Sequence, residues 1–161
     1  MIKKFNLLLL TFFNIGNIKY APGSIASFVT CVLFLIVSEY LSLQIIFFFT
    51  LIIFMYSLNA INKSYKDFNY EDPQEIVIDE FVGQIIPLLA IPIYETLYPS
   101  SQLFYCTASF LTFRFFDILK PFPINYIEKN TKGALGIMLD DIFAGFITII
   151  ILSVIFFFLG G

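Results

Sequence analysis

The chain has 161 residues, of which 59% are hydrophobic and only 13% are charged, and its formal net charge is −3. Charged residues make up roughly 25% of an ordinary soluble domain, so the composition excludes that class and predicts a membrane protein with a single domain over residues 1–161. The acidic balance argues against a nucleic-acid partner, and the absence of histidine excludes histidine-dependent hydrolysis and histidine-ligated zinc.

The N-terminal segment carries Lys3 and Lys4 before a short apolar stretch, as a signal peptide does, but no small-residue cleavage site follows. We interpret this segment as a helix that lies at the membrane surface.

Gly23 and Ser24 come next, in an Ala-Pro-Gly-Ser sequence that opens the first apolar run. Backbone N–H groups at such a helix start can bind an anion, which predicts substrate binding at Gly23 and Ser24. A plain turn with a helix cap is the alternative.

Apolar runs occur at residues 25–37, 43–58, 76–93, 103–118 and 137–159. A membrane-spanning helix needs about 20 apolar residues, which the last run provides, whereas the first is short. Residues 72–75 read Asp-Pro-Gln-Glu and predict the start of the third helix, because they supply an N-cap, a proline and a capping-box glutamate. We therefore predict an all-α, multi-pass membrane helix bundle with about five apolar helices and a short interfacial helix near residues 123–130.

Lysines alternate along the connections between these runs. They occur before the first run, in the 59–75 loop and in the 119–136 loop, whereas residues 38–42 and 94–102 have none. Because basic segments tend to stay on the cytoplasmic side, we expect these three segments there. All the unusual polar residues then fall at one depth, which predicts a single site at the cytoplasmic membrane boundary.

Acidic side chains open two of the runs, Asp79 and Glu80 in the third and Asp140 and Asp141 in the fifth. Charges in a membrane helix are costly and usually functional. Carboxylates with few cations to cancel them suit a divalent metal, so these four acids are the predicted metal ligands. Small residues one helical turn further on would let the acidic helices approach closely. The alternative is that the acids only stabilise helix N-termini, a gain of about 0.3–1 kcal/mol.

Arg114, Asp117 and Lys120 close the fourth run. A guanidinium beside metal-binding carboxylates suits phosphate oxygens, and both Arg114 and Lys120 would stabilise charge on a phosphoryl group. The alternatives are a structural ion pair between Arg114 and Asp117 and a Lys120 that merely anchors the helix at the interface. Together these residues predict hydrolysis of a phosphate ester at the membrane surface by a metal-activated water.

Four segments of the chain resemble the phosphatidylglycerophosphatase A family, in the family's order and spacing. They are Ala-Pro-Gly-Ser-Ile-Ala-Ser (21–27), Glu-Ile-Val-Ile-Asp-Glu-Phe-Val-Gly (75–83), Phe-Arg-Phe-Phe-Asp-Ile-Leu-Lys-Pro-Phe-Pro-Ile (113–124) and Gly-Ala-Leu-Gly-Ile-Met-Leu-Asp-Asp-Ile-Phe-Ala-Gly (133–145). The resemblance implies a bacterial inner-membrane, Mg²⁺-dependent phosphatase of phospholipid biosynthesis, which converts phosphatidylglycerophosphate to phosphatidylglycerol.

The same resemblance implies which side chains act. It assigns the family's functional motif residues to Asp79, Glu80, Arg114, Asp117, Lys120, Asp140 and Asp141. The chain departs from the family's pattern at three places. Lys132 stands where a histidine often occurs, Ala134 stands where a second glycine is common, and Ser-Ile-Ala-Ser (24–27) differs slightly from the family's usual threonine–x–glycine–serine.

Three other functions compete with a phosphatase. Intramembrane acids can carry ions or protons, so an ion- or proton-coupled membrane transporter is the main alternative, although the acids lie at one depth and no inverted repeat is visible. A lipid phosphotransferase would carry an Asp-Gly-x-x-Ala-Arg motif, which is absent. A non-catalytic assembly factor would use the acids as structural charges.

Overall fold

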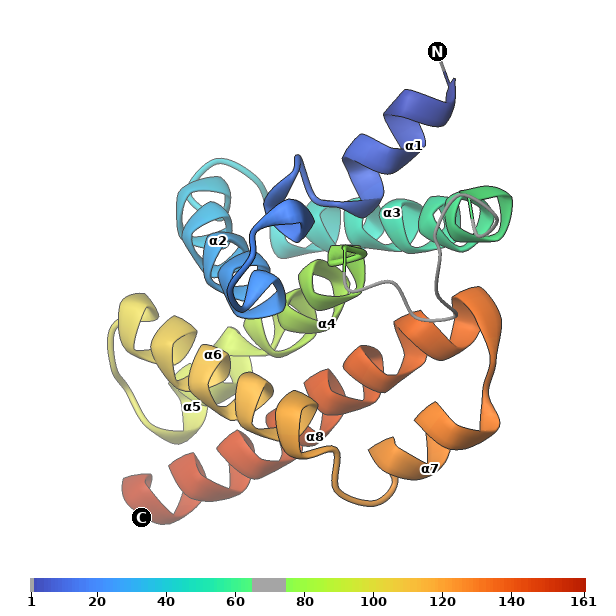
Figure 1. Cartoon of the computed structure of the whole chain (residues 1–161). Coiled ribbons are helices and arrows are strands. Elements are labelled where there is room, and N and C mark those ends of the chain that lie inside the picture. Colours follow the sequence, from blue (N-terminus) through green and yellow to red (C-terminus); the bar gives the residue numbers. More distant parts are fainter. Residues whose placement is uncertain (1, 65–74) are drawn as a thin grey trace.

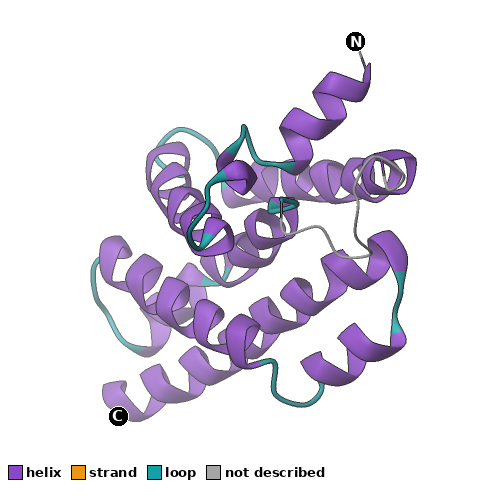
Figure 2. Cartoon of the chain, viewed as in Figure 1, coloured by secondary structure: helices purple, strands orange, loops and turns teal. Residues whose placement is uncertain are grey.

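The computed structural model describes residues 2–64 and 75–161, and these residues form helices and loops without a strand (Figures 1 and 2). The prediction of an all-α fold is confirmed. In chain order the elements are α1 (Ile2–Leu10), the short 3-10 helix η1 (Ile15–Asn17), α2 (Pro22–Val37), α3 (Leu43–Ser64), α4 (Ile78–Leu89), α5 (Ile91–Leu97), α6 (Gln102–Leu119), α7 (Ile124–Asn130) and α8 (Gly133–Gly160). The long helix α8 is central and contacts α3, α4, α5, α6 and α7.

Three segments of the described residues are long and apolar enough to cross a membrane, against the count of about five that we predicted. They are Leu43–Lys63, Ile78–Leu97 and Gly133–Gly160. All five apolar runs are helical, but α2 has 16 residues and rises about 24 Å, less than a hydrocarbon core of about 30 Å. Helix α6 has 18 residues but carries Arg114 and Asp117 in its last two turns.

The third apolar run forms two helices, α4 and α5, and the first of them begins later than we predicted from the sequence. Helix α4 begins at Ile78. Residues 72–74, and Lys66 of the 59–75 loop, lie outside the described residues. The backbone N–H of Val77 donates to the Leu10 carbonyl at 3.0 Å, which ties the entry of α4 to the end of α1. Pro87 lies inside the last turns of α4, and the chain restarts as α5 after Ala90 with Pro92 in its first turn. Because Pro92 has no backbone N–H with which to continue the hydrogen-bond ladder of α4, the helix is interrupted there.

Helices α2 and α6 connect the same two ends of the bundle as the longer helices. At one end, the Gln102 side chain at the start of α6 donates to Ser38 Oγ, just after α2, at 2.7 Å. There too, Gly160 lies so close to the Leu97 carbonyl that an added Cβ would collide with it. The starts of α2 and α4 and the end of α6 meet at the opposite end, around the cavity described below.

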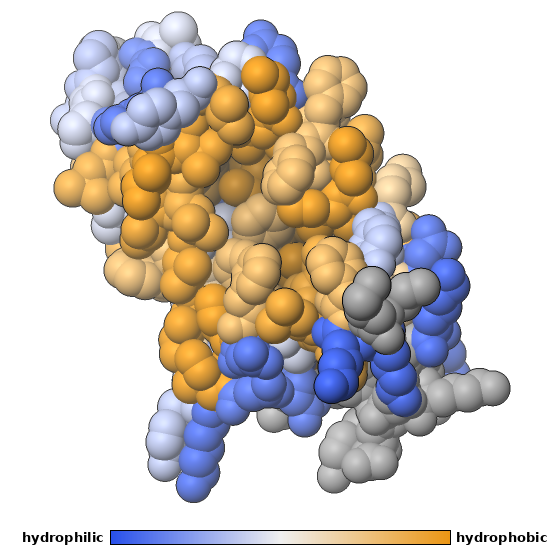
Figure 3. Space-filling view, turned by 90° about the horizontal axis from the view of Figure 1, so that it is seen from above, coloured by the Kyte–Doolittle hydropathy of each residue, from blue (hydrophilic) through white to orange (hydrophobic). Residues whose placement is uncertain are grey.

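Apolar side chains fill the interior and also cover much of the outside. One buried cluster surrounds Tyr94 and Phe156, and a second surrounds Leu10 and Met138. On the face shown in Figure 3, apolar residues form a broad band between hydrophilic groups at opposite ends. Large exposed apolar side chains, such as Phe158 on α8, belong to this surface. An exposed apolar surface of this extent is typical of a protein in contact with lipid.

Candidate active site

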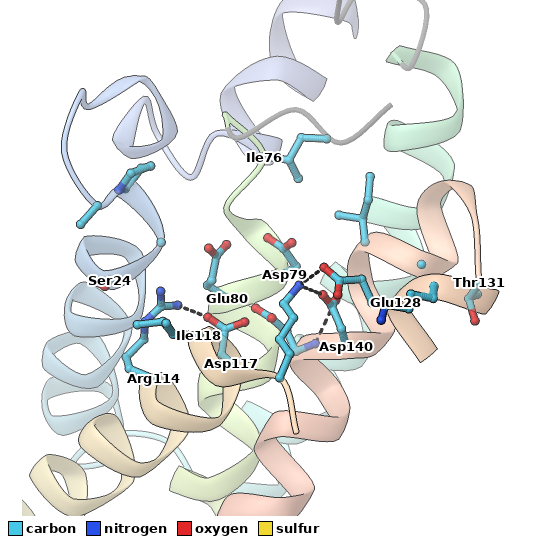
Figure 4. A pocket seen from close by; sticks show the side chains of 18 of the residues that line it. Ser24, Ile76, Asp79, Glu80, Arg114, Asp117, Ile118, Glu128, Thr131 and Asp140 are labelled. Carbon is cyan, nitrogen blue, oxygen red and sulfur yellow. Dashed lines mark hydrogen bonds and ion pairs between the residues drawn. The ribbon is translucent and has the colours of Figure 1, made fainter. Parts of the chain in front are cut away.

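A cavity of about 670 Å³ lies where the ends of α2, α4 and α6 meet the first turns of α8 (Figure 4). Its lining contains every residue that the sequence analysis selected: Gly23, Ser24, Asp79, Glu80, Arg114, Asp117, Lys120, Asp140 and Asp141. The predicted convergence of these residues on a single site is thus found in the structure. Their catalytic and binding roles remain predictions.

Close contact between α4 and α8 brings the acidic helices together. A Cβ added to Gly83 would lie 2.8 Å from the Asp141 carbonyl oxygen, and a Cβ added to Gly145 would lie 2.6 Å from the Gly83 carbonyl oxygen. Neither position has room for a side chain, so both glycines permit a backbone-to-backbone approach. Asp79 and Asp141 each precede one of these glycines by one helical turn, which places both carboxylates above the contact.

Helix α2 closes another side of the cavity through its first turn. A Cβ added to Gly23 would collide with Glu80 Oε1 and would lie 3.4 Å from Arg114 Nη1. Ala21 caps this helix with a left-handed backbone, φ 46°, a conformation that costs free energy for a residue other than glycine. The start of α2 therefore lies directly against charged groups of α4 and α6.

Three carboxylates form a compact group at the centre of the cavity. One oxygen each from Asp79, Glu80 and Asp141 lies within 4.8 Å of the others. In each of the three residues one buried carboxylate oxygen has no hydrogen-bond partner among the described residues. Buried, unpaired carboxylate oxygens are unfavourable unless a cation compensates them. Because Mg²⁺ and Ca²⁺ prefer oxygen ligands, these three residues fit a divalent cation.

Asp140 lies outside this group, so only three of the four predicted metal ligands lie together. Its Oδ2 lies 2.7 Å from Lys120 Nζ, and its Oδ1 accepts a hydrogen bond of 3.1 Å from the backbone N–H of Asp141. Consecutive residues of a helix point about 100° apart. Asp141 therefore turns toward α4, while Asp140 turns toward the end of α6.

Lys120 joins three elements at the edge of the cavity. It caps the C-terminus of α6 with a left-handed backbone, φ 42°, and its Nζ donates to Glu128 Oε1 at 2.6 Å as well as to Asp140. Burial lowers the pKa of Lys120, but the hydrogen bonds and attraction of Asp140 and Glu128 outweigh it, so that the pKa lies above its usual value. The ammonium is thus held in place and charged. Lys120 therefore does more than anchor the helix at the membrane interface.

Arg114 forms the ion pair that the sequence analysis gave as an alternative. Its Nη1 lies 2.6 Å from Asp117 Oδ2, and both side chains are largely buried. The guanidinium has five N–H donors, and its Nε has no partner among the described residues. The ion pair therefore orients Arg114 toward the cavity and leaves donors available for an anion.

Glu128 and Lys129 also line the cavity, although the sequence analysis assigned neither of them to a site. Both lie on α7, which the chain reaches after a reversal at Pro121 and Pro123. The available signal was this pair of prolines directly after Lys120, because a turn there folds the next helix back over the end of α6. Lys132, which was noted only as a departure from the family's pattern, lines the cavity as well.

Comparison with known proteins identifies relatives across nearly the whole chain. The model of the family described as phosphatidylglycerophosphatase A matches residues 8–156. The chain is 37% identical over 143 residues to phosphatidylglycerophosphatase A of Haemophilus influenzae, which covers 89% of this chain and 83% of that protein. It is 38% identical over 87 residues to phosphatidylglycerophosphatase A of Escherichia coli, covering 54% of this chain and 46% of that protein. No solved structure matches the chain.

Proposed function

Because the chain belongs to the phosphatidylglycerophosphatase A family, we propose that it hydrolyses the terminal phosphate of phosphatidylglycerophosphate to give phosphatidylglycerol. Membership of this family makes the protein a phosphatase. The observation that carries the proposal is the group of three carboxylates at the centre of a cavity that also holds Arg114 and Lys120. Carboxylates for a cation beside cations for an anion are what a phosphate ester requires.

The proposed cofactor is Mg²⁺, held by Asp79, Glu80 and Asp141. Six carboxylates and four cationic side chains line the cavity, so an excess of negative charge would repel a phosphate. A divalent cation at these three residues would remove the excess, polarise the phosphoryl oxygens and lower the pKa of a bound water. Asp140, which was also a predicted ligand, is given the role of fixing Lys120.

The remaining residues bind and orient the phosphate in this proposal. Arg114 contacts the phosphoryl oxygens through the guanidinium donors that Asp117 leaves available. Lys120 contributes the third proton of its ammonium, since two are already donated to Glu128 and Asp140. Gly23 and Ser24 offer backbone N–H groups from the first turn of α2.

The proposed reaction is direct hydrolysis, which needs no covalent enzyme intermediate. The oxygen of water forms a bond to phosphorus, and the bond from phosphorus to the glycerol oxygen breaks. The glycerol oxygen takes up a proton, so the products are inorganic phosphate and phosphatidylglycerol. Arg114 and Lys120 would stabilise the charge that develops on the phosphoryl oxygens.

We further propose that the protein crosses the bacterial inner membrane several times, with the cavity on the cytoplasmic side. The lysines of the 119–136 connection lie at the end of the bundle that contains the cavity. Basic residues favour the cytoplasmic side of a membrane protein. At that depth a phospholipid presents its phosphate groups.

An ion- or proton-coupled transporter is not favoured. A transport path requires polar groups that continue from one side of the membrane to the other. The charged lining of the cavity lies at one end of the bundle, and an apolar cluster around Tyr94 and Phe156 occupies the other end. The relatives from two bacteria are named as phosphatases.

The first test is phosphate release from phosphatidylglycerophosphate by the detergent-purified protein, with Mg²⁺ and with a chelator. We expect release only with Mg²⁺, and a fall of at least about a hundredfold in Asp79→Asn and Asp141→Asn. Mg²⁺ should also raise the Tm of the wild type by binding the folded state, and this rise should vanish in both variants.

Glu39→Gln is the matched control, because Glu39 is an exposed acid outside the cavity. It should retain both the activity and the Mg²⁺-dependent rise in Tm. A folded wild type that releases no phosphate from this lipid would refute the proposed substrate. Full activity in the presence of the chelator would refute the proposed cofactor alone.

A further inference from the structure

Two of the four cationic side chains that line the cavity have no partner among the described residues. Arg114 is paired with Asp117, and Lys120 is paired with Glu128 and Asp140. By contrast, the ammonium groups of Lys129 and Lys132 make no hydrogen bond or ion pair with any residue in the described ranges 2–64 and 75–161. These two lysines are therefore available to an anion that enters the cavity.

The two lysines line the cavity together with Thr131 and Gly133, where the chain passes from α7 to α8. Figure 4 shows the carboxylates between Ser24 on one side and Thr131 on the other, and Thr131 lies between the two lysines in the chain. Gly133, the first residue of α8 and the neighbour of Lys132, precedes Asp140 by seven residues, which corresponds to about 10 Å along the helix axis. Open space adjoins Lys132, since a Cβ added to Gly133 would have no other atom within 4 Å.

The proposed substrate carries two phosphate groups joined through a glycerol. One is the terminal monoester that is cleaved, and the other is the diester that links the glycerol to the lipid. When the monoester lies against the central carboxylates, the diester must lie a glycerol length away from it. A lysine suits this group, because its compact charge pairs with a phosphate oxygen without demanding a fixed geometry.

We propose that Lys129 and Lys132 bind the phosphodiester of the substrate and so select phospholipids that carry two phosphate groups. This inference rests on the proposed function and specifies which part of the substrate each end of the cavity binds. The lysines touch the substrate at a group that does not react. Their loss should therefore weaken binding more than it slows the chemical step.

The test compares two substrates in detergent micelles of equal surface charge. Phosphatidylglycerophosphate has both groups, whereas phosphatidic acid has a phosphate monoester and no phosphodiester. In the double variant Lys129→Gln, Lys132→Gln we expect KM for phosphatidylglycerophosphate to rise about tenfold, the loss of roughly one charged hydrogen bond. The kcat should change little, and hydrolysis of phosphatidic acid should not change.

Lys63→Gln is the matched control, because Lys63 is an exposed lysine of α3 outside the cavity. It should not alter either KM. An equal rise in KM for both substrates would mean that Lys129 and Lys132 attract anionic surfaces in general, and it would overturn the inference. An unchanged KM in the double variant would overturn it as well.

Inhibition of phosphatidylglycerophosphate hydrolysis gives a second measurement that needs no activity toward phosphatidic acid. Phosphatidylglycerol retains the phosphodiester and lacks the terminal phosphate, so it should inhibit the wild type more strongly than the double variant. Inorganic phosphate should inhibit both equally, because it competes at the carboxylate end. Equal inhibition by phosphatidylglycerol would contradict the inference. A wild type without activity toward phosphatidylglycerophosphate would instead refute the proposed function on which the inference rests.

Discussion

Two adjacent aspartates of α8 have different surroundings, and we propose that they have different roles at the site. Asp141 belongs to the carboxylate group with Asp79 and Glu80. Asp140 forms an ion pair with Lys120, which also pairs with Glu128 on α7. We therefore propose that Asp141 binds the cation and that Asp140 positions the side chain of Lys120.

This division predicts that Asp140→Asn and Asp141→Asn lose activity for different reasons. In Asp140→Asn the Mg²⁺-induced rise in Tm should persist, while phosphate release should fall about tenfold or more because Lys120 is no longer held beside the substrate. In Asp141→Asn the rise in Tm should disappear. Thermal denaturation with and without Mg²⁺, beside the rate assay, measures both. Loss of the rise in Asp140→Asn would show that Asp140 is a ligand after all.

The sequence alone could predict that these acids lie close together. It could not predict that Asp140 contacts Lys120 while Asp141 joins Asp79 and Glu80. Their spacing from Gly83 and Gly145 predicted a close approach of two helices, and the cavity contains every selected residue. The rotation of α8 about its axis decides which aspartate faces α4, and that rotation depends on packing against several helices. Glu128 was missed for a related reason, since its contact with Lys120 depends on the direction of the turn between α6 and α7.

At the scale of elements, the contact between α4 and α8 sets the distance between the acids. Gly83 and Gly145 allow the two backbones to touch one turn below Asp79 and Asp141. The sequence predicted the helical runs but not the division of the third run at Ala90, for which Pro92 was the available signal. Its predicted start was at residues 72–75, of which 72–74 lie outside the described residues, but α4 begins only at Ile78.

We expect Gly83→Ala to force α4 and α8 apart. The new Cβ would lie 2.8 Å from the Asp141 carbonyl oxygen and 2.9 Å from Asp141 Cβ, and overpacking of this kind costs about 1–3 kcal/mol. The Tm should fall, and phosphate release should fall further than stability alone explains, because Asp79 and Glu80 move away from Asp141.

The control for this change is Gly161→Ala. A Cβ added there would lie 3.6 Å from the nearest atom, the Phe157 carbonyl oxygen, which is an ordinary contact. Both Tm and activity of this control should match the wild type. Wild-type activity in Gly83→Ala would show that the α4–α8 contact does not set the geometry of the acids.

At the scale of the whole molecule, an apolar band separates a charged end from the end at which Ser38 meets Gln102. Three segments are long and apolar enough to cross a membrane, and α2 and α6 run between the same two ends. Composition predicted a membrane protein, but the predicted count of about five spans is not confirmed by the lengths of the helices.

The proposed orientation predicts opposite labelling of two introduced cysteines in intact cells. A membrane-impermeant maleimide should label Ser42→Cys, in the connection before α3, without permeabilisation. It should label Asn130→Cys, at the end of α7 beside the cavity, only after permeabilisation. The native Cys31 and Cys106 are buried and should contribute little background. The reverse pattern would place the cavity on the outer side.

The position of the cavity at one end of the bundle determines how the substrate reaches it. If that end lies at the membrane boundary as proposed, a phospholipid need not leave the bilayer, because its acyl chains stay beside the apolar band while its head group enters the cavity. The encounter is then diffusion in two dimensions. The turnover of each molecule would follow the mole fraction of substrate in the membrane rather than its amount per volume of solution.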